Sequence, residues 1–200
     1  PESQFENLLE LYNKKNFKEA LELIENLLDS FPKSAKLFSL KGIINASLKQ
    51  FEQAMSCFKR ATEIRPDFAE AYFNMGFANA EQGNLKTAIL YFKKTLDLNS
   101  DYAPAYNNLG IALRETGDFD TAVINFQRAL KIKPNYTGAL NNLGITYYEM
   151  GDISNSISTF LKAIRSNPEE RNSWYNLHYS LKASEFLESL SFDPLDILDK

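Results

Sequence analysis

Asparagine recurs at a fixed interval along much of the chain. Asn74, Asn108, Asn142 and Asn176 are each separated by 34 residues. A carboxamide carries a donor and an acceptor, so it can pair with the C=O and N–H of an extended peptide without reading its side chains. Asparagine is also a poor residue for a helix interior, which makes its repetition in helical sequence notable. The row therefore predicts a surface that grips peptide backbone.

Further residues of the same segments are expected on the same surface. Asn107 and Asn141 directly precede two members of the row and would widen its polar strip. Apolar and aromatic residues recur beside the row, and they would either accept apolar groups of a partner or pack between neighbouring helices. These apolar and aromatic residues, together with one arginine, are the further candidate peptide-binding residues: Phe73, Phe77, Ile111, Arg114, Ile145 and Tyr148.

Duplication offers a second explanation of the asparagine row. Units that arose from one ancestor share residues by descent. An asparagine that faces solvent in a helix costs under about 1 kcal/mol, so it can persist without a function. Both explanations are compatible with the sequence.

The residue types that enzymes use do not form a recognisable set. His178 is the only histidine and Cys57 the only cysteine, so neither a catalytic triad nor a histidine-rich metal site is expected. The glycine-containing pairs lie at turns between predicted helices rather than in a phosphate-binding loop. We expect no catalytic residue, no metal and no cofactor, and we expect that the chain is not an enzyme.

Composition narrows the partners. The 200 residues are 44% hydrophobic and 24% charged, and the net charge is −4. An acidic chain lacks the basic face that nucleic acid or an anionic membrane requires, so neither is an expected partner. The amino end, PESQFENLLE, has no basic-then-apolar leader. A lone cysteine is typical of a reducing compartment, so the sequence favours a cytoplasmic location.

The 34-residue spacing of the asparagines is also the spacing at which whole segments of the sequence repeat. Segments 37–66, 71–100, 105–134 and 139–168 align without insertions at a shift of 34 residues. Residues 1–34 fit the frame more weakly, with Leu8 where the other units have glycine. The sequence predicts a repeat domain over 1–183 and a tail over 184–200. The domain would contain five units and a capping helix, at 1–34, 35–68, 69–102, 103–136, 137–170 and 171–183.

Each unit has the pattern of two antiparallel helices. A glycine and, twelve positions later, a small residue allow the helices to approach closely, as at Gly110 and Ala122. The pairs GN at 83 and GD at 117 and 151 supply a glycine that ends one helix and a residue able to cap the next. Phenylalanine recurs as a packing residue at Phe58, Phe92, Phe126 and Phe160. These features predict an all-α fold.

The pattern resembles the tetratricopeptide repeat (TPR) family over residues 1 to about 183. This resemblance implies a right-handed superhelical solenoid of five helix-turn-helix repeats closed by a capping helix, with the first helices forming a concave inner wall. The candidate residues above would lie on that wall. The segments AYFNMG, AYNNLG and ALNNLG also resemble repeats of O-linked N-acetylglucosamine transferase, whose asparagines grip substrate backbones.

The function expected from this resemblance is that of a protein–protein interaction scaffold that holds extended peptide segments in its groove. The alternative is the substrate-recognition or oligomerisation part of a larger glycosyltransferase, sulfotransferase or oxygenase whose catalytic domain lies outside these residues. A purely structural spacer is a third, weaker hypothesis. The carboxylate clamp that holds chaperone tails in related repeats is absent, because the fifth positions of the units carry no lysine.

The tail, 184–200, leaves the repeat frame. It interleaves acidic residues with apolar ones and contains the break Asp193-Pro194. It is either a linker or a segment that docks, onto its own last helix or into the groove of another copy. The second possibility predicts a homo-oligomer formed through the tail.

Overall fold

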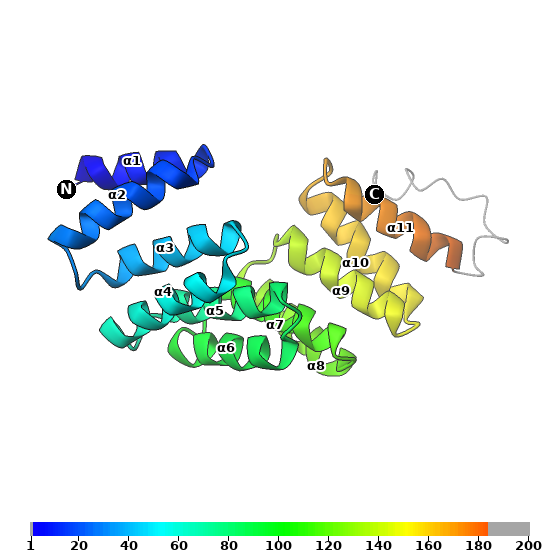
Figure 1. The fold of residues 1–200 in the computed structure, drawn as a ribbon. Coiled ribbons are helices and arrows are strands. Elements are labelled where there is room, and N and C mark those ends of the chain that lie inside the picture. The colour runs from blue at the N-terminus through cyan, green and yellow to red at the C-terminus, as the bar shows by residue number, and fades with distance from the viewer. Residues whose placement is uncertain (1, 184–200) are drawn as a thin grey trace. The chain divides into compact units, whose positions relative to one another are not determined.

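The computed structural model describes residues 2–183, with side chains from residue 6 onward. In this range every element of regular secondary structure is an α-helix, which confirms the predicted all-α class. The first helices of the repeats are α1 (Glu2–Asn13), α3 (Ala35–Ser47), α5 (Ala69–Glu81), α7 (Ala103–Glu115), α9 (Thr137–Glu149) and α11 (Arg171–Ala183) (Figure 1). The second helices are α2 (Phe17–Ser30), α4 (Phe51–Ile64), α6 (Leu85–Leu98), α8 (Phe119–Ile132) and α10 (Ile153–Ser166).

Consecutive helices pack as antiparallel pairs. Each first helix contacts the second helix that follows it, and α11 packs against both α9 and α10 as the predicted final helix. The chain forms two compact units, Pro1–Ser100 and Asp101–Lys200, and each is described by itself. The amino-terminal unit contains α1 to α6, and the carboxyl-terminal unit contains α7 to α11.

A glycine and a phenylalanine bring the two helices of a repeat together. A Cβ atom placed on Gly110 would lie 2.7 Å from the Phe126 ring, closer than real Cβ atoms approach a neighbour. The same obstruction occurs at Gly42, Gly76 and Gly144, each against the phenylalanine of its own repeat. All four rings are almost completely buried. The packing role predicted for these phenylalanines is therefore confirmed.

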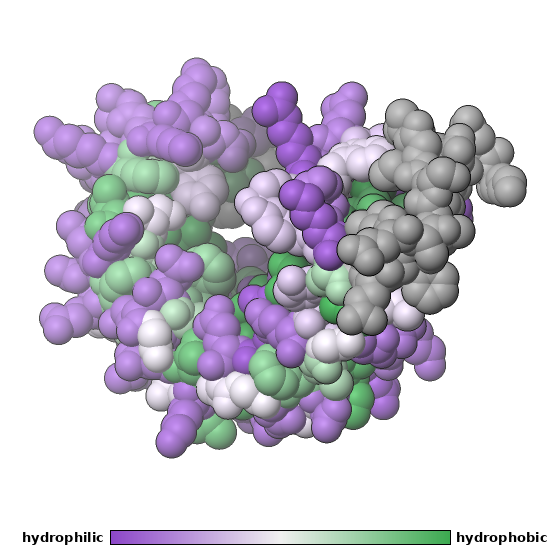
Figure 2. Space-filling view, turned by 90° about the vertical axis from the view of Figure 1, so that its right-hand side faces the viewer, coloured by the Kyte–Doolittle hydropathy of each residue, from purple (hydrophilic) through white to green (hydrophobic). Residues whose placement is uncertain are grey.

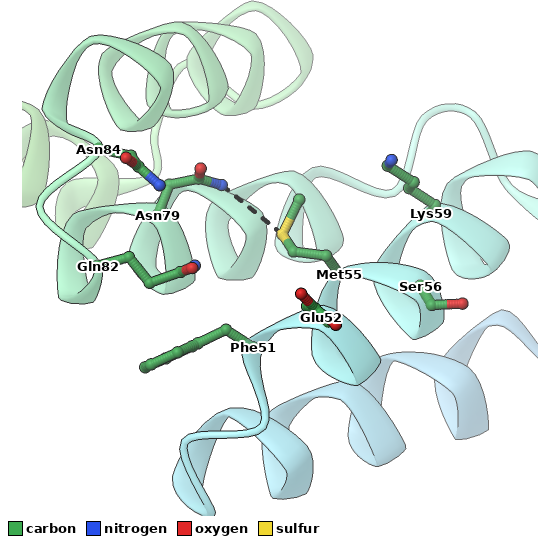
Figure 3. A pocket seen from close by; sticks show the side chains of 8 residues that line it. All are labelled: Phe51, Glu52, Met55, Ser56, Lys59, Asn79, Gln82 and Asn84. Carbon is green, nitrogen blue, oxygen red and sulfur yellow. Dashed lines mark hydrogen bonds between the residues drawn. The ribbon is translucent and has the colours of Figure 1, made fainter.

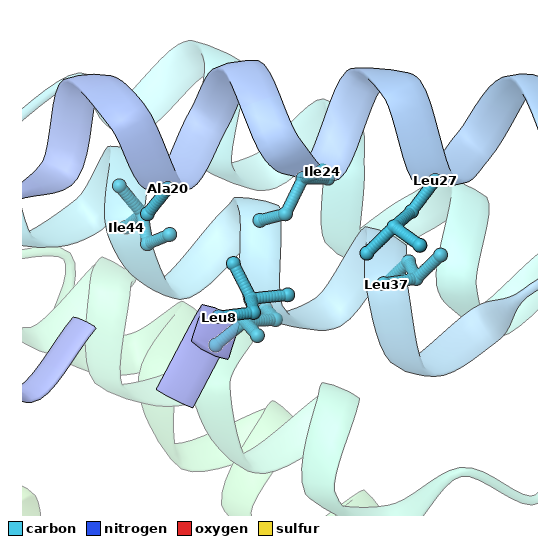
Figure 4. Close-up of a cluster of buried hydrophobic side chains, with 7 residues drawn as sticks. Leu8, Ala20, Ile24, Leu27, Leu37 and Ile44 are labelled. Carbon is cyan, nitrogen blue, oxygen red and sulfur yellow. The ribbon is translucent and has the colours of Figure 1, made fainter. Parts of the chain in front are cut away.

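The first repeat fills the same space differently. Leu8 occupies the glycine position and Ile24 the phenylalanine position, and both are fully buried. Two side chains of medium size thus stand where the other repeats have a glycine and a large phenylalanine, so the filled volume of the core is similar. Around them lie Ala20, Leu27, Leu37, Leu40 and Ile44 (Figure 4).

The turn within each repeat requires one residue in the left-handed region. Gly117 has a φ of 85°, and Gly83 and Gly151 have similar values. Lys15 and Lys49 hold the equivalent positions in the first two repeats, also at positive φ. The predicted helix-ending glycines are therefore confirmed.

The caps that follow these turns agree only in part with the prediction. Asp118 accepts a hydrogen bond from the Thr121 N–H at 3.3 Å, and Asp152 accepts one from the Asn155 N–H at 3.2 Å. Asn84 makes no side-chain cap bond. Two of the three predicted caps are thus formed.

Candidate functional site

The carboxyl-terminal unit places three members of the asparagine row on neighbouring helices. Asn108 lies on α7, Asn142 on α9 and Asn176 on α11, at the same position of each helix. Helix α9 contacts both α7 and α11. All three side chains are partly exposed. Asn74 has the equivalent position on α5 of the amino-terminal unit.

The adjacent asparagines Asn107 and Asn108 make different contacts. The Asn142 amide donates a hydrogen bond to the Asn107 oxygen at 3.0 Å, and Asn107 in turn donates to the Asn108 oxygen at 3.2 Å. Asn107 is only 6% exposed. It therefore joins α7 to α9, whereas Asn108 remains partly accessible at the surface.

Asn141 has a similar connecting contact. The Ser173 hydroxyl donates a hydrogen bond to the Asn141 oxygen at 2.9 Å and is itself fully buried. This bond joins α9 to α11. Ser173 was not among the residues predicted from the sequence, because nothing in its own repeat position marks it as a partner of asparagine.

Several amide groups of the row remain available. Among the residues that the structure describes, none is hydrogen-bonded to the Asn108 side-chain nitrogen, to the Asn142 side-chain oxygen or to either polar atom of Asn176. A partly exposed carboxamide with a free donor or acceptor can bind a peptide group of a partner. The free groups come from three successive first helices.

The amino-terminal unit has a different arrangement at the equivalent pair. The Asn74 amide nitrogen is buried without a hydrogen-bond partner among the described residues, and so is the Ser39 hydroxyl. These residues correspond to Asn142 and Asn107, which bond to each other. Serine is shorter than asparagine, so the direct amide pair of the other unit is not reproduced here.

The remaining predicted neighbours differ in accessibility. In the amino-terminal unit, the Phe73 ring lies 5.8 Å from the Phe92 ring between centroids, and Phe77 is 46% exposed. In the other unit, Ile111 and Ile145 are half-buried. The Arg114 side chain is mostly covered, and its Nε lies 3.8 Å from a Glu149 oxygen. Arg114 thus forms a weak ion pair between α7 and α9.

An apolar pocket lies beside Asn176 in the carboxyl-terminal unit. Its volume is about 260 Å³. We call it the aromatic pocket, and its lining residues are Ile145, Tyr148, Phe160, Tyr175, Asn176, Tyr179 and Ser180. It contains two predicted site residues from α9 together with residues of α10 and α11.

Two tyrosines of α11 form the outer side of the aromatic pocket. The Tyr175 and Tyr179 rings are 4.7 Å apart between centroids, and their hydroxyl oxygens are 2.9 Å apart. Their hydrogen bond raises the pKa of Tyr175, with a smaller contribution from the Tyr179 charge. Tyr175 is 61% exposed and Tyr179 is 47% exposed, so both present aromatic surface to a partner.

A second pocket, of about 420 Å³, lies in the amino-terminal unit (Figure 3). Its amides are largely engaged by their own helix. The Asn79 nitrogen donates to the Met75 carbonyl at 2.8 Å and contacts the Met55 sulfur at 3.6 Å, and Gln82 donates to the Ala78 carbonyl. Its lining residues are Phe51, Glu52, Met55, Ser56, Lys59, Asn79, Gln82 and Asn84.

The face of the molecule shown in Figure 2 is mixed in polarity. On the face shown in Figure 2, hydrophilic side chains project between smaller hydrophobic areas. Within residues 6–183 no group of three or more histidine, cysteine, aspartate or glutamate side chains is arranged to hold a metal ion. No helix in the described part of the chain combines the length and apolarity needed to cross a membrane.

Several solved structures have folds similar to that of this chain. The crystal structure of MamA has 23% identity and a TM-score of 0.71, covering 81% of this chain and 95% of that one. YrrB, described as a TPR protein with an unusual peptide-binding site, has 19% identity and a TM-score of 0.67, covering 84% and 87%. TTC0263, a thermophilic TPR protein of Thermus thermophilus, has 19% identity and a TM-score of 0.73, covering 90% and 98%.

Comparison of the sequence with models of protein families identifies the repeats. No curated protein sequence matches this chain. One model of the tetratricopeptide repeat matches the chain twice, at residues 67–135 and 101–169, and a second TPR repeat model matches residues 42–83. The first two matches together span 67–169, which is more than half of the 200 residues. With the packed helix pairs and their 34-residue period, they show that the chain belongs to the tetratricopeptide repeat family.

Proposed function

We propose that this chain is a scaffold that binds extended segments of partner proteins along its first helices. The observation that carries this proposal is the set of free amide groups on Asn108, Asn142 and Asn176, which lie at one position of three successive helices. In the amino-terminal unit Asn74 would act through its side-chain oxygen, because its amide nitrogen is buried. Membership of the TPR family and the peptide-binding site named for YrrB support a protein-interaction role.

The helix spacing fits an extended peptide. Packed helices lie about 10 Å apart, and an extended chain advances roughly 3.3 Å per residue. Each asparagine would therefore meet the peptide at about every third residue. Asn107 and Asn141 contribute by fixing this spacing, because their hydrogen bonds join α7 to α9 and α9 to α11.

The amide groups alone bind weakly. A hydrogen bond contributes about 0.5 to 1.5 kcal/mol net, so three contacts give on the order of 2 to 4 kcal/mol before the cost of ordering the peptide. Useful affinity therefore needs side-chain anchors. Ile111, Ile145 and Tyr148 supply apolar surface beside the row, and Phe73 and Phe77 do so in the other unit.

Weak capture also suits a module that is tethered to a second one. The alternative function is accordingly the substrate-recognition or oligomerisation part of a larger enzyme, with catalysis outside these residues. We further propose that residues 1–183 act as one domain and that the protein is cytoplasmic. The sequence also predicts a homo-oligomer formed through residues 184–200, and that segment lies outside the described residues.

Selection from a random-peptide display library tests the proposed function without a known partner. Asn108→Ala/Asn176→Ala removes two of the proposed contacts and the acceptor of the Asn107 nitrogen, but it leaves the bond between Asn107 and Asn142 in place. We expect peptides enriched on the wild-type chain to bind this variant about tenfold more weakly, the loss of one to two hydrogen bonds.

The matched control is Asn135→Ala/Asn172→Ala, which removes two exposed asparagines of the same unit. It should bind the selected peptides like the wild-type chain. Equal binding by both variants would assign the asparagine row to common ancestry of the repeats. Circular dichroism and thermal melting must show that all chains are equally folded.

A further inference from the structure

The aromatic pocket lies on a helix that has no second helix after it in the described residues. Helix α11 packs against α9 and α10 through Leu177 and Trp174, while Tyr175 and Tyr179 remain exposed on another side. At about 260 Å³ the pocket is smaller than the usual site for a small-molecule ligand. Its size and apolar lining suit a single bulky side chain.

The end of α11 lies on the same side of the helix as the pocket. Residues three and four apart lie on the same face of an α-helix. Ala183, the last residue of α11, is three residues after Ser180 and four after Tyr179, and both of these line the pocket. Ala183, the last described residue, therefore lies on the face of α11 that lines the pocket.

The length of the continuation allows it to return. Asn176 and Tyr179 lie about 6 to 10 Å back along α11 from Ala183, at 1.5 Å per residue. Reversing direction takes a turn of about four residues, after which an extended chain covers about 3.3 Å per residue. Phe186 is only three residues after Ala183, too few for a turn and a return to the pocket. Phe192 is nine residues after Ala183, so it can reach the pocket.

The charges are complementary as well. Lys182 lies on the pocket side of α11, three residues after Tyr179, and forms no ion pair within residues 6–183. Residues 184–200 carry five carboxylates, one of which, Asp193, directly follows Phe192. A segment of the same chain also has a high effective concentration at its neighbouring pocket.

We propose that residues 184–200 of the same chain occupy the aromatic pocket, with the Phe192 ring beside Ile145 and Tyr179 and with Asp193 beside Lys182. The contact itself does not depend on the proposed function. One consequence of the contact does rest on the proposed function. Because Asn176 lines the pocket, the docked tail would compete with a partner peptide for Asn176, the last residue of the asparagine row.

Methyl-directed NMR on the full chain tests the contact. The Ile145 δ-methyl group is labelled, and phenylalanine is protonated in an otherwise deuterated chain. We expect a nuclear Overhauser effect from this methyl group to Phe160, which shares the pocket, and a second one to Phe192. Phe192→Ala should remove the second signal and keep the first. Phe186→Ala, the matched control, should keep both.

A mixed sample identifies which chain supplies the ring. It combines labelled chains that have deuterated phenylalanine with unlabelled chains that have protonated phenylalanine. We expect no signal to Phe192 in this sample, since the contact lies within one chain. A signal there would overturn the proposal in favour of a second copy. Loss of the Phe192 signal in the first sample, with the Phe160 signal intact, would overturn it in favour of a pocket open to other partners.

Discussion

Two adjacent asparagines in one helix have separate tasks. Asn107 is buried and bonds to Asn142 of the next repeat, whereas Asn108 keeps a free amide nitrogen at the surface. A poor helix former is tolerated at both positions, since one joins two helices and we propose that the other binds a partner. The distinction leads to different expectations for substitutions within the row.

Asn142→Ala and Asn176→Ala should affect stability differently. Removing Asn142 leaves the buried Asn107 oxygen without its donor, so the free energy of unfolding should fall by about 1 to 2 kcal/mol. Asn176 has no hydrogen-bond partner among the described residues, so its loss should cost under about 0.5 kcal/mol. Urea denaturation of the two variants measures the difference. Equal destabilisation would contradict the assigned contacts.

Ser39→Asn should stabilise the amino-terminal unit. The substitution would recreate, with Asn74, the amide pair formed by Asn107 and Asn142: it would give the buried Asn74 nitrogen an acceptor and remove the Ser39 hydroxyl, which has no partner among the described residues. A hydrogen bond contributes about 1 kcal/mol, so denaturant unfolding should shift by that amount. Ser39→Ala serves as the control and should fall short of this gain. A less stable Ser39→Asn chain would argue against the equivalence of the two pairs.

Cys57 should make stability depend on pH in the alkaline range. Burial raises the pKa of its thiol above the ordinary value of 9.0, against smaller opposing effects of Lys41 and of the Asn45 hydrogen bond. Above about pH 9 the unfolded thiol loses its proton before the folded one does, so folding binds more protons and stability falls as the pH rises. Below this range the contribution is fully present.

The comparison with Cys57→Ala isolates this effect. Burial also raises the pKa of Tyr136, which acts in the same direction at higher pH in both chains. Urea denaturation at about pH 8 and about pH 9.5 should show a larger decrease for the wild-type chain than for the variant. Parallel decreases would mean that the Cys57 thiol does not titrate differently in the folded and unfolded chains.

At the scale of the helix pair, stability depends on a size match between two positions. Gly110 leaves room for the Phe126 ring, and the first repeat meets the same need with Leu8 and Ile24. The pairing explains why glycine, usually unfavourable in a helix, is retained in the middle of α7. It also explains how the first repeat keeps the fold without it.

Gly110→Ala should therefore destabilise the carboxyl-terminal unit. The new Cβ would meet the Phe126 ring, and overpacking of this kind costs about 1 to 3 kcal/mol. Adding Phe126→Leu should recover part of the loss, because a smaller side chain makes room as Ile24 does in the first repeat. Thermal melting of the single and double variants measures both effects. An additive loss in the double variant would contradict the size match.

The elements could be predicted from the sequence because their signals are local and repeated. Gly83, Gly117 and Gly151 mark the turns, and each is observed at positive φ. Asn84 makes no cap bond, unlike Asp118 and Asp152, although asparagine is an equally favoured capping residue, and nothing in the structure explains the difference.

The candidate site could be predicted only in outline. The sequence places Asn107 and Asn108 on one helix, but their burial depends on how closely α9 approaches, which no local pattern encodes. Likewise, Ser173 becomes a partner of Asn141 only once α11 packs against α9. The aromatic pocket also needs residues of three helices, α9, α10 and α11, so their types alone do not reveal it.

At the scale of the whole molecule, the protein is a tetratricopeptide repeat protein, and we propose that its function lies in a regularly spaced set of amides. Hydrogen bonds to a peptide backbone do not depend on the side chains of the peptide, so the amides would recognise a partner only by their regular spacing. Specificity would come from apolar anchors such as Ile145 and Tyr148. The central claim is thus that this protein binds a peptide through its backbone at regular intervals.

An N-methyl scan of a peptide selected on the wild-type chain tests that claim most directly. Each peptide nitrogen is methylated in turn, which removes one donor while the side chains stay unchanged. We expect affinity losses of about fivefold at the two positions, about three residues apart, whose N–H groups bind the free oxygens of Asn142 and Asn176. Only the loss that depends on Asn176 should disappear in Asn108→Ala/Asn176→Ala. A flat profile, with affinity sensitive only to changes of peptide side chains, would contradict it.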